Sequence, residues 1–147
     1  MNIIATFDGK YAFLSNFYYS PITIAGINFP TVEHAFQAMK TIDVAERQLI
    51  AAAPTPGKAK RLGRTVHLRE DWEEAKESVM YLCLKAKFGI PELREKLLAT
   101  GESELIEGTL WHDNEWGSCS CDKCVNIPGK NKLGKLLMKV REELKNE

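Results

Sequence analysis

The chain has 147 residues, 44% of them hydrophobic, with 20 basic and 20 acidic side chains. This length and balance predict one compact soluble domain over residues 1–147, and the zero net charge argues against a protein that coats nucleic acid non-specifically. The start of the chain does not resemble a secretory signal and the apolar runs are too short to span a membrane, so we expect a cytoplasmic protein without a membrane partner.

Short apolar runs alternate with turn residues over the first 30 residues. The runs NIIATF, YAFLSNFYY and ITIAGINF are separated by the turn DGK and by a bend near Gly26. Runs of this length, bounded by glycine and aspartate, are typical of strands joined by tight turns. We therefore predict a small N-terminal antiparallel sheet built from hairpins.

The pattern becomes helical at Thr31, which is a predicted N-cap for a helix to about Thr41. Asp43 is a predicted cap for a second helix, which stops at Pro54 because proline cannot continue it. Thr55, followed by proline, then predicts the start of a third helix. Three short helices are therefore expected in succession.

A longer helix is predicted next. Asp71 with Glu74 three residues later resembles a capping box, which marks a helix start. Pro91 begins a further helix, ELIEGTL is a candidate strand, and Asn131 is a predicted cap for an amphipathic C-terminal helix. Together these elements predict a helix-rich α+β fold. The apolar stripe expected on the longer helix comprises Trp72, Ala75, Val79, Leu82 and Ala86.

The first predicted helix carries a polar stripe. Glu33, Gln37 and Lys40 lie within roughly 60° of one another on a helical wheel, opposite Ala35 and Met39. One interpretation is a solvated face whose side chains support one another. The other is a site in which Glu33, held ionised by the helix N-terminus, acts on the carbon of a sugar.

The charges are segregated along the chain. Residues 47–69 contain basic side chains and no acid, whereas residues 101–122 contain acidic side chains and no lysine or arginine. The basic segment suits phosphate groups, with Arg64 as the best single candidate, and the acidic segment suits a cation. The alternative is that the two segments pair with each other.

Three cysteines crowd into one short segment. Cys119, Cys121 and Cys124 lie within six residues, with His112 seven positions earlier, and together they offer enough ligands for a tetrahedral zinc site. Such a zinc ion would hold the loop and take no part in chemistry. The competing interpretation is three reduced thiols in a tight turn. Cys83 lies beside an apolar stripe and is expected to pack.

Five motifs in order identify a family resemblance. FLSNFYYSPI, FPTVEHAFQAMK, TPGKAKRLGR, LREDWEEAKESVM and GKNKLGKLLMKVREEL, with these spacings, closely resemble the NADAR or YbiA-like family over nearly the whole chain. The resemblance implies the YbiA-like fold and an enzyme that cleaves the N-glycosidic bond between a ribose and a nitrogen base, with no cofactor required. The segment WGSCSCDKC departs from the glycine- and aspartate-rich loop of many relatives.

The resemblance also implies which residues act. The glutamate of the family's VEHAFQA motif is Glu33, and its acidic residue before a Trp-Gly pair is Asp113, before Trp116 and Gly117, with Glu115 as the alternative. Glu33 would stabilise positive charge on the sugar or activate water, and Asp113 would orient the water or the ribose hydroxyls.

The remaining candidates concern the ligand. Lys40 would form a Schiff base with ring-opened ribose, or else bind a phosphate or pair with an acid. Phe17 and Trp116 are candidates for stacking on the base, and Asn16 and Asn131 for hydrogen bonds to it. Trp72 belongs to the family's DW motif but also heads an apolar stripe. His112 is a candidate donor to the leaving base or a structural residue.

Three functions compete at this stage. The first is a ribosyl N-glycosidase acting on small phosphoribosyl or ADP-ribosyl molecules or on ADP-ribosylated nucleic acid. The second is a non-catalytic sensor that binds ADP-ribose or NAD, and the third is a zinc-stabilised adaptor. Glu33 distinguishes them, because only the enzyme needs its carboxylate for turnover.

Overall fold

The computed structural model describes residues 2–147, which form two compact units. One, the middle unit, comprises residues 16–90, and the other, the terminal unit, comprises residues 2–15 and 91–147. Among the described residues, none of the helices is both long enough and apolar enough to traverse a bilayer. The single domain expected from chain length stays a prediction.

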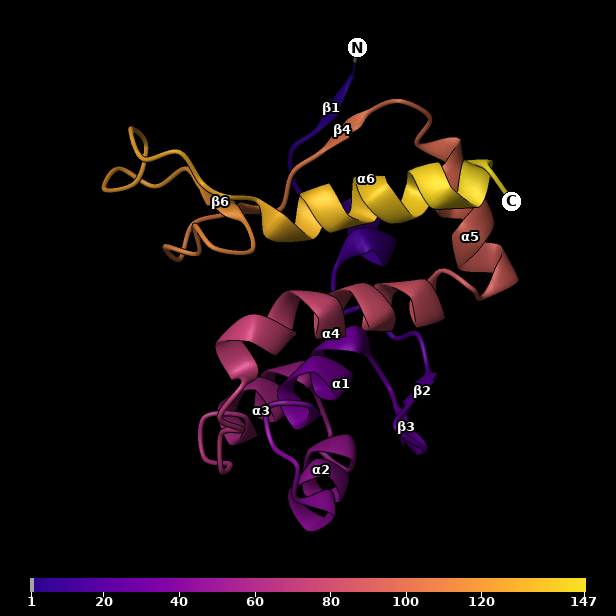
Figure 1. Cartoon of the computed structure of the whole chain (residues 1–147). Coiled ribbons are helices and arrows are strands. Elements are labelled where there is room, and N and C mark those ends of the chain that lie inside the picture. Colours follow the sequence, from indigo (N-terminus) through magenta and orange to yellow (C-terminus); the bar gives the residue numbers. More distant parts are fainter. Residues whose placement is uncertain (1) are drawn as a thin grey trace. The chain divides into compact units, whose positions relative to one another are not determined.

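The middle unit packs four helices with one hairpin (Figure 1). The hairpin turns at Ala25 and Gly26, which both have positive φ, as a two-residue turn that matches strand twist requires. The first helix contacts each of the other three. The elements are β2 (Ile22–Ile24), β3 (Ile27–Phe29), α1 (Val32–Ala38), α2 (Val44–Ala51), α3 (Pro56–Leu62) and α4 (Trp72–Lys87).

The terminal unit joins the two ends of the chain. Its strand β1 pairs in parallel with β4, and α6 contacts both β4 and α5 (Figure 1). A second parallel pair, β5 with β6, lies in the loop region before α6. The elements are β1 (Ile3–Ile4), η1 (Gly9–Leu14), α5 (Pro91–Ala99), β4 (Glu104–Leu105), β5 (Gly108–Thr109), β6 (Ser118–Cys119) and α6 (Lys132–Lys145).

The predicted starts of the first three helices are confirmed. Thr31 accepts a hydrogen bond from the backbone of His34, Asp43 from two amides of α2, and Thr55 from the backbone of Lys58. These contacts satisfy amides that the helix itself leaves without a partner. Helix α1 ends at Ala38, before the predicted Thr41.

The predicted N-terminal sheet is correct only for the β2–β3 hairpin. Residues 9–14, within the run expected to be a strand, form the 3₁₀-helix η1, and β1 pairs with the distant β4. The expected strand in ELIEGTL is present as two short strands. Pairing with a partner about 100 residues away leaves no mark in a local pattern.

Two predictions for α4, the residues on its inward face and its capping box, differ from the structure. Of the predicted stripe, Trp72 is buried but Leu82 is 58% exposed, and the other buried residues are Met80, Cys83, Leu84 and Lys87. Asp71 makes no capping hydrogen bond, because its carboxylate is paired with Arg69 at 2.6 Å. The helix begins where expected, but without the capping box.

Asn131 precedes α6 without capping it. Its backbone is left-handed, and its side chain accepts from the backbone of Glu107 and donates to the carbonyl of Leu105. Carbonyl groups of residues 114–117 accept from the amides of residues 130–133 instead. The N-terminus of α6 is therefore capped by the preceding loop.

Candidate functional site

The polar stripe of α1 is buried. Glu33 is 8% exposed and Gln37 5%, while Lys40, just beyond the helix, is half-buried. Every residue from Thr31 to Met39 is buried. The interpretation of this stripe as a solvated face is therefore wrong, and a buried carboxylate requires an explanation.

Glu33 makes hydrogen bonds through both its backbone and its side chain. Its backbone amide donates to the carbonyl of Asn16 at 3.0 Å, and its carboxylate accepts from the side-chain amide of Gln37 at 2.8 Å. The first turn of a helix and a hydrogen bond to the charged form both favour the carboxylate anion. Glu33 thus has the environment of a base or of a partner for a cation.

Two buried oxygens beside Glu33 have no hydrogen-bond partner within residues 2–147. They are the side-chain oxygens of Asn16 and Gln37. The orientation of Gln37 is set by Glu33, because only its NH₂ group can face the carboxylate. Unsatisfied buried acceptors are costly, so they are expected where a bound donor, such as a hydroxyl, completes them.

Cations adjoin the other end of the stripe. Desolvation lowers the pKa of Lys40, Glu33 acts to raise it, and Arg64 and Lys60 lower it further. Glu33, Arg64 and Lys60 are therefore each close enough to act on Lys40. Arg64 is exposed and Lys60 half-buried. A carboxylate at one end and three cations at the other suit a ligand with both a sugar and a phosphate.

Glu33 also influences the thiol of Cys83 on α4. Burial raises the pKa of Cys83 to about 12, and the charge of Glu33 contributes in the same direction. Cys83 is fully buried, so the expectation that it packs is confirmed. The thiol is held neutral, which leaves the carboxylate of Glu33 as the charged group on this side.

Lys87 is a buried residue that the sequence analysis missed. It is fully buried at the end of α4, its amine lies 5.8 Å from the ring centre of Tyr18 and 5.1 Å from that of Phe88, and burial lowers its pKa to about 7. Helical periodicity puts Lys87 on one face with Met80 and Cys83, but only the packing of α4 shows that this face is buried.

Trp72 is a core residue of the middle unit. It is 6% exposed, and its ring lies 5.1 Å from that of Phe36, tilted by 57°. Of the two interpretations of Trp72, a ligand-binding residue or the first residue of an apolar stripe, the second agrees with its buried position. Phe17, by contrast, is 45% exposed and available to a ligand.

The remaining predicted residues lie in the terminal unit. Asp113 accepts from the backbone amides of Glu115 and Trp116 at 3.1 and 3.0 Å, which shapes the turn before Gly117. The hydrogen bond from Lys132 lowers the pKa of Glu115 to about 2. Asp113 and Glu115 thus have distinct partners, and Glu115 is the one held by lysines.

Close packing explains why glycine occupies position 117, in the turn, and position 134, in α6. A Cβ on Gly117 would collide with the carbonyl of Glu107, and one on Gly134 with the carbonyl of Leu105. The second position brings the backbone of β4 against α6. The contact of Asn131 with a base stays a prediction, although both ends of its side chain have partners inside the unit.

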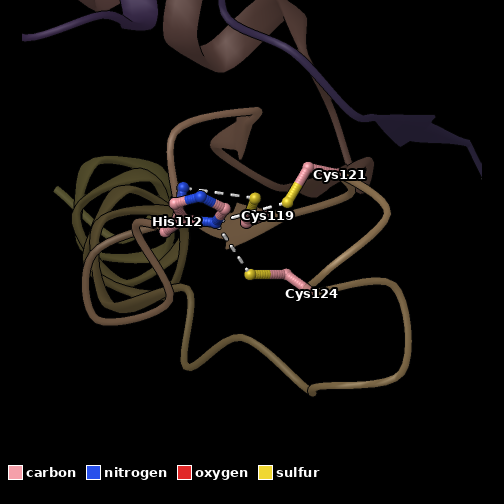
Figure 2. Close-up of side chains that lie close together, drawn as sticks. All are labelled: His112, Cys119, Cys121 and Cys124. Carbon is pink, nitrogen blue, oxygen red and sulfur yellow. Dashed lines mark hydrogen bonds between the residues drawn. The ribbon is translucent and has the colours of Figure 1, made fainter.

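His112 and the three cysteines of the loop before α6 form a cluster (Figure 2). The candidate ligand atoms, one per residue, all lie within 4.8 Å of one another. Such a group could hold a metal ion.

A cleft of about 700 Å³ also lies in the middle unit, lined by residues 41–43 and 67–71. None of the predicted catalytic residues lines it, although Lys40 directly precedes its first residue. Its rim contains the pair Arg69 and Asp71.

The fold is helix-rich α+β, and its middle unit contains a buried acid, Glu33, whose charge acts on Lys40. The family model described as the NADAR domain matches residues 5–145. The chain therefore belongs to the NADAR domain family, as its motifs indicate.

Curated relatives match nearly the whole of this chain. The chain is 43% identical over 147 residues to N-glycosidase YbiA of Escherichia coli (strain K12), covering 98% of this chain and 88% of that protein. An N-glycosidase of Nostoc punctiforme is 42% identical, with 92% and 87% covered. A riboflavin biosynthesis protein of Vibrio vulnificus is 38% identical, covering 93% of this chain and 36% of that protein.

A solved structure is similar throughout. The NMR structure of the Escherichia coli protein YbiA is 42% identical, covers 99% of this chain and 84% of that chain, and superposes with a TM-score of 0.81. The predicted fold class, α+β of the YbiA-like kind, is confirmed.

Proposed function

We propose that this protein is an N-glycosidase that hydrolyses the bond between C1 of a ribose and a nitrogen base in a phosphoribosyl or ADP-ribosyl substrate. Relatives over nearly the full chain are named N-glycosidases, and a longer relative is named a riboflavin biosynthesis protein. The observation that carries the proposal is the buried carboxylate of Glu33, which is hydrogen-bonded to Gln37 and acts electrostatically on Lys40.

Glu33 is the proposed catalytic residue. Breaking the C1–N bond places positive charge on C1 and the ring oxygen, and the electron pair of the bond leaves with the base. A carboxylate anion beside C1 stabilises that charge, and it accepts a proton as water adds to C1. The proton that the base gains balances the one that water gives up.

The side-chain oxygens of Asn16 and Gln37 are proposed to accept hydrogen bonds from the ribose hydroxyls. Both oxygens are buried beside Glu33 and lack a partner within the described chain. A pentose supplies donors of the right kind, and satisfying these acceptors would recover the cost of burying them.

Lys40, Lys60 and Arg64 are proposed to bind the phosphate. The charges of Glu33, Arg64 and Lys60 all act on Lys40, which supports a phosphate site near the proposed sugar site. The roles of Phe17 and of Trp116 in stacking, and of Asp113 as the second acid, stay predictions from the sequence. Trp72 is better explained as a core residue.

A covalent role for Lys40 is a separate alternative. Its half-buried amine, with a lowered pKa, could add to C1 of ring-opened ribose and release water as an imine forms. Borohydride added during turnover would then reduce the imine and leave a stable adduct on Lys40. An adduct-free Lys40 together with an active Lys40→Arg variant would exclude this route.

The experiment combines three substrates with one matched pair of variants. Ribosylaminopyrimidine phosphate, ADP-ribosylated guanine oligonucleotide and NAD are each incubated with the protein, and the released base is measured. Glu33→Gln should abolish release while keeping ligand affinity, and Glu74→Gln, exposed on α4, should release base like the parent protein.

Two outcomes would contradict the proposal. Ligand binding without release of base by the parent protein would favour the sensor function. Equal release by Glu33→Gln and the parent protein would remove Glu33 from the chemistry. Release from the oligonucleotide alone would assign the substrate to ADP-ribosylated nucleic acid.

A further inference from the structure

The loop between β5 and α6 gathers four potential metal ligands on one side. Figure 2 shows the sulfur atoms of Cys119, Cys121 and Cys124 turned toward the ring of His112. The Nδ1 atom of His112 lies 3.2 Å from the sulfur of Cys124 and 3.3 Å from that of Cys121. Cys119 and Cys124 are buried, although the neighbouring loop residues are largely exposed.

The spacing suits a tetrahedral ion. With Zn–S bonds of about 2.3 Å and Zn–N bonds of about 2.0–2.1 Å, a tetrahedral site separates two sulfurs by about 3.8 Å and a sulfur from a nitrogen by about 3.6 Å. The four donor atoms here all lie within 4.8 Å of one another. Coordination would therefore shorten the longest separations and lengthen the two Nδ1–S distances, now 3.2 and 3.3 Å, by a few tenths of an ångström.

The backbone holds the four residues in this arrangement. Pairing of β5 with β6 fixes Cys119, whose amide also donates to the side chain of Asn114 at 2.9 Å. His112 has a positive φ of 66°, unusual for a residue with a side chain, and its amide donates to the sulfur of Cys119 at 3.3 Å. The amide of Cys124 bonds the carbonyl of Cys121. Amide hydrogen bonds to sulfur favour the thiolate.

We propose that His112, Cys119, Cys121 and Cys124 bind one zinc ion as a structural site. Three thiolates and one imidazole are a common ligand set for structural zinc, and four protein ligands leave no open position for a substrate. The site therefore supplies folding energy to the loop and no chemistry. This proposal is independent of the N-glycosidase function.

The consequence of zinc binding is a fixed cap for α6. His112 and Cys119 bracket the turn that contains Asp113 and Trp116. Carbonyls of residues 114–117 accept from the amides of residues 130–133, so an ion that fixes the bracket also fixes the start of α6. Loss of the ion should loosen this whole segment.

Metal content is the first measurement. The full chain is purified without chelator and without a polyhistidine tag, under reducing conditions, and its metals are quantified by mass spectrometry. We expect about one zinc per chain. A chain that holds no zinc, and that gives no tetrahedral cobalt–thiolate absorption after reduction and anaerobic addition of cobalt(II), would overturn the proposal.

Matched variants locate the ion. Cys121→Ser changes the most exposed of the three thiols and should lose most of the zinc, whereas Cys83→Ser, in the middle unit, should retain it. His112→Ala should weaken cobalt binding, and His67→Ala, an exposed histidine, should not. Unchanged metal content in Cys121→Ser and His112→Ala would place the ion elsewhere and contradict the assignment.

Amide exchange provides a readout apart from metal content. Removing zinc with a chelator should increase hydrogen exchange in residues 110–133 and leave the amides of α1 unchanged. Circular dichroism before and after removal shows whether the chain stays folded. Equal rates of amide hydrogen exchange in residues 110–133 with and without zinc would show that the ion does not stabilise this loop.

Discussion

Gln37 donates its side-chain amide to the carboxylate of Glu33, one helical turn earlier, while its own oxygen is buried without a partner in residues 2–147. The pair therefore links the proposed catalytic anion to an acceptor that a ligand can complete. Replacing Gln37 by Met keeps the length of the side chain and removes both functions. Because hydrogen bonds to a charged group contribute about 1.5–3 kcal/mol, turnover should fall about tenfold or more.

Steady-state rates, measured with whichever of the three candidate substrates releases base, provide the test. Gln48→Met, on the exposed face of α2, is the control and should keep the parent rate. A Gln37→Met variant as active as the control would show that the pair does not support catalysis.

Gly63 is predicted to be intolerant of alanine. A Cβ at this position would collide with the side-chain oxygen of Gln37, although the backbone of Gly63 is ordinary right-handed helix. Gly63→Ala should lower the free energy of unfolding by about 1–3 kcal/mol, as overpacking does, or displace Gln37 and reduce turnover. Gly57→Ala, in the same helix, meets only Thr55 at 3.9 Å and should lower neither quantity.

The cations near Lys40 are predicted to act on affinity. Arg64→Ala and Lys60→Ala should raise KM for a phosphorylated substrate more than they change kcat, because both charges act on Lys40 at the proposed phosphate site. Lys58→Ala, also on α3, serves as the matched control. Equal KM values for a substrate with and without its phosphate would contradict the assignment.

His34 is predicted to make stability depend on acid. Desolvation lowers its pKa, with the carbonyl of Ala53 acting in the opposite direction, and its ring contacts Thr31 at 2.8 Å and Ala53 at 3.0 Å. The unfolded chain therefore binds a proton near pH 6.5 that the folded chain does not. Stability should fall as the pH drops below 6.5, by at most about 1.4 kcal/mol per pH unit.

Chemical unfolding between pH 7 and 5 tests this dependence. His34→Gln should flatten the profile in that range, and His67→Gln, whose side chain is 91% exposed, should leave it in place. A parent protein with equal stability at pH 6.5 and 5 would disprove the prediction.

Lys87 is predicted to make the stability of the folded chain depend on pH between pH 7 and 9. Burial lowers its pKa from 10.5 to about 7, so between pH 7 and 9 the unfolded chain holds a proton that the folded chain has released. Stability should therefore rise with pH across this range. Lys87→Met should reduce the slope, measured by urea unfolding at several pH values, whereas Lys58→Met should retain it. A parent profile that falls from pH 7 to 9 would reverse the sign and reject the prediction.

The predicted site was recoverable in part from local signals. The family motifs identified Glu33, and cap chemistry located the starts of α1, α2 and α3, because a cap is a contact between residues two or three apart. The motifs predicted an N-glycosidase, and the relatives are named N-glycosidases.

Burial decided what these signals could not. A helical wheel gives the stripe of Glu33 and Gln37 one direction, but whether that direction meets solvent depends on which elements pack against α1. For the same reason the wheel chose the wrong face of α4, where Lys87 is inside and Leu82 outside. The sequence by itself determined the helix starts, the family and the ligand types of the cysteine loop. Tertiary structure alone decided the burial of the polar stripe and the parallel pairing of β1 with β4, because both depend on contacts between residues far apart in the chain.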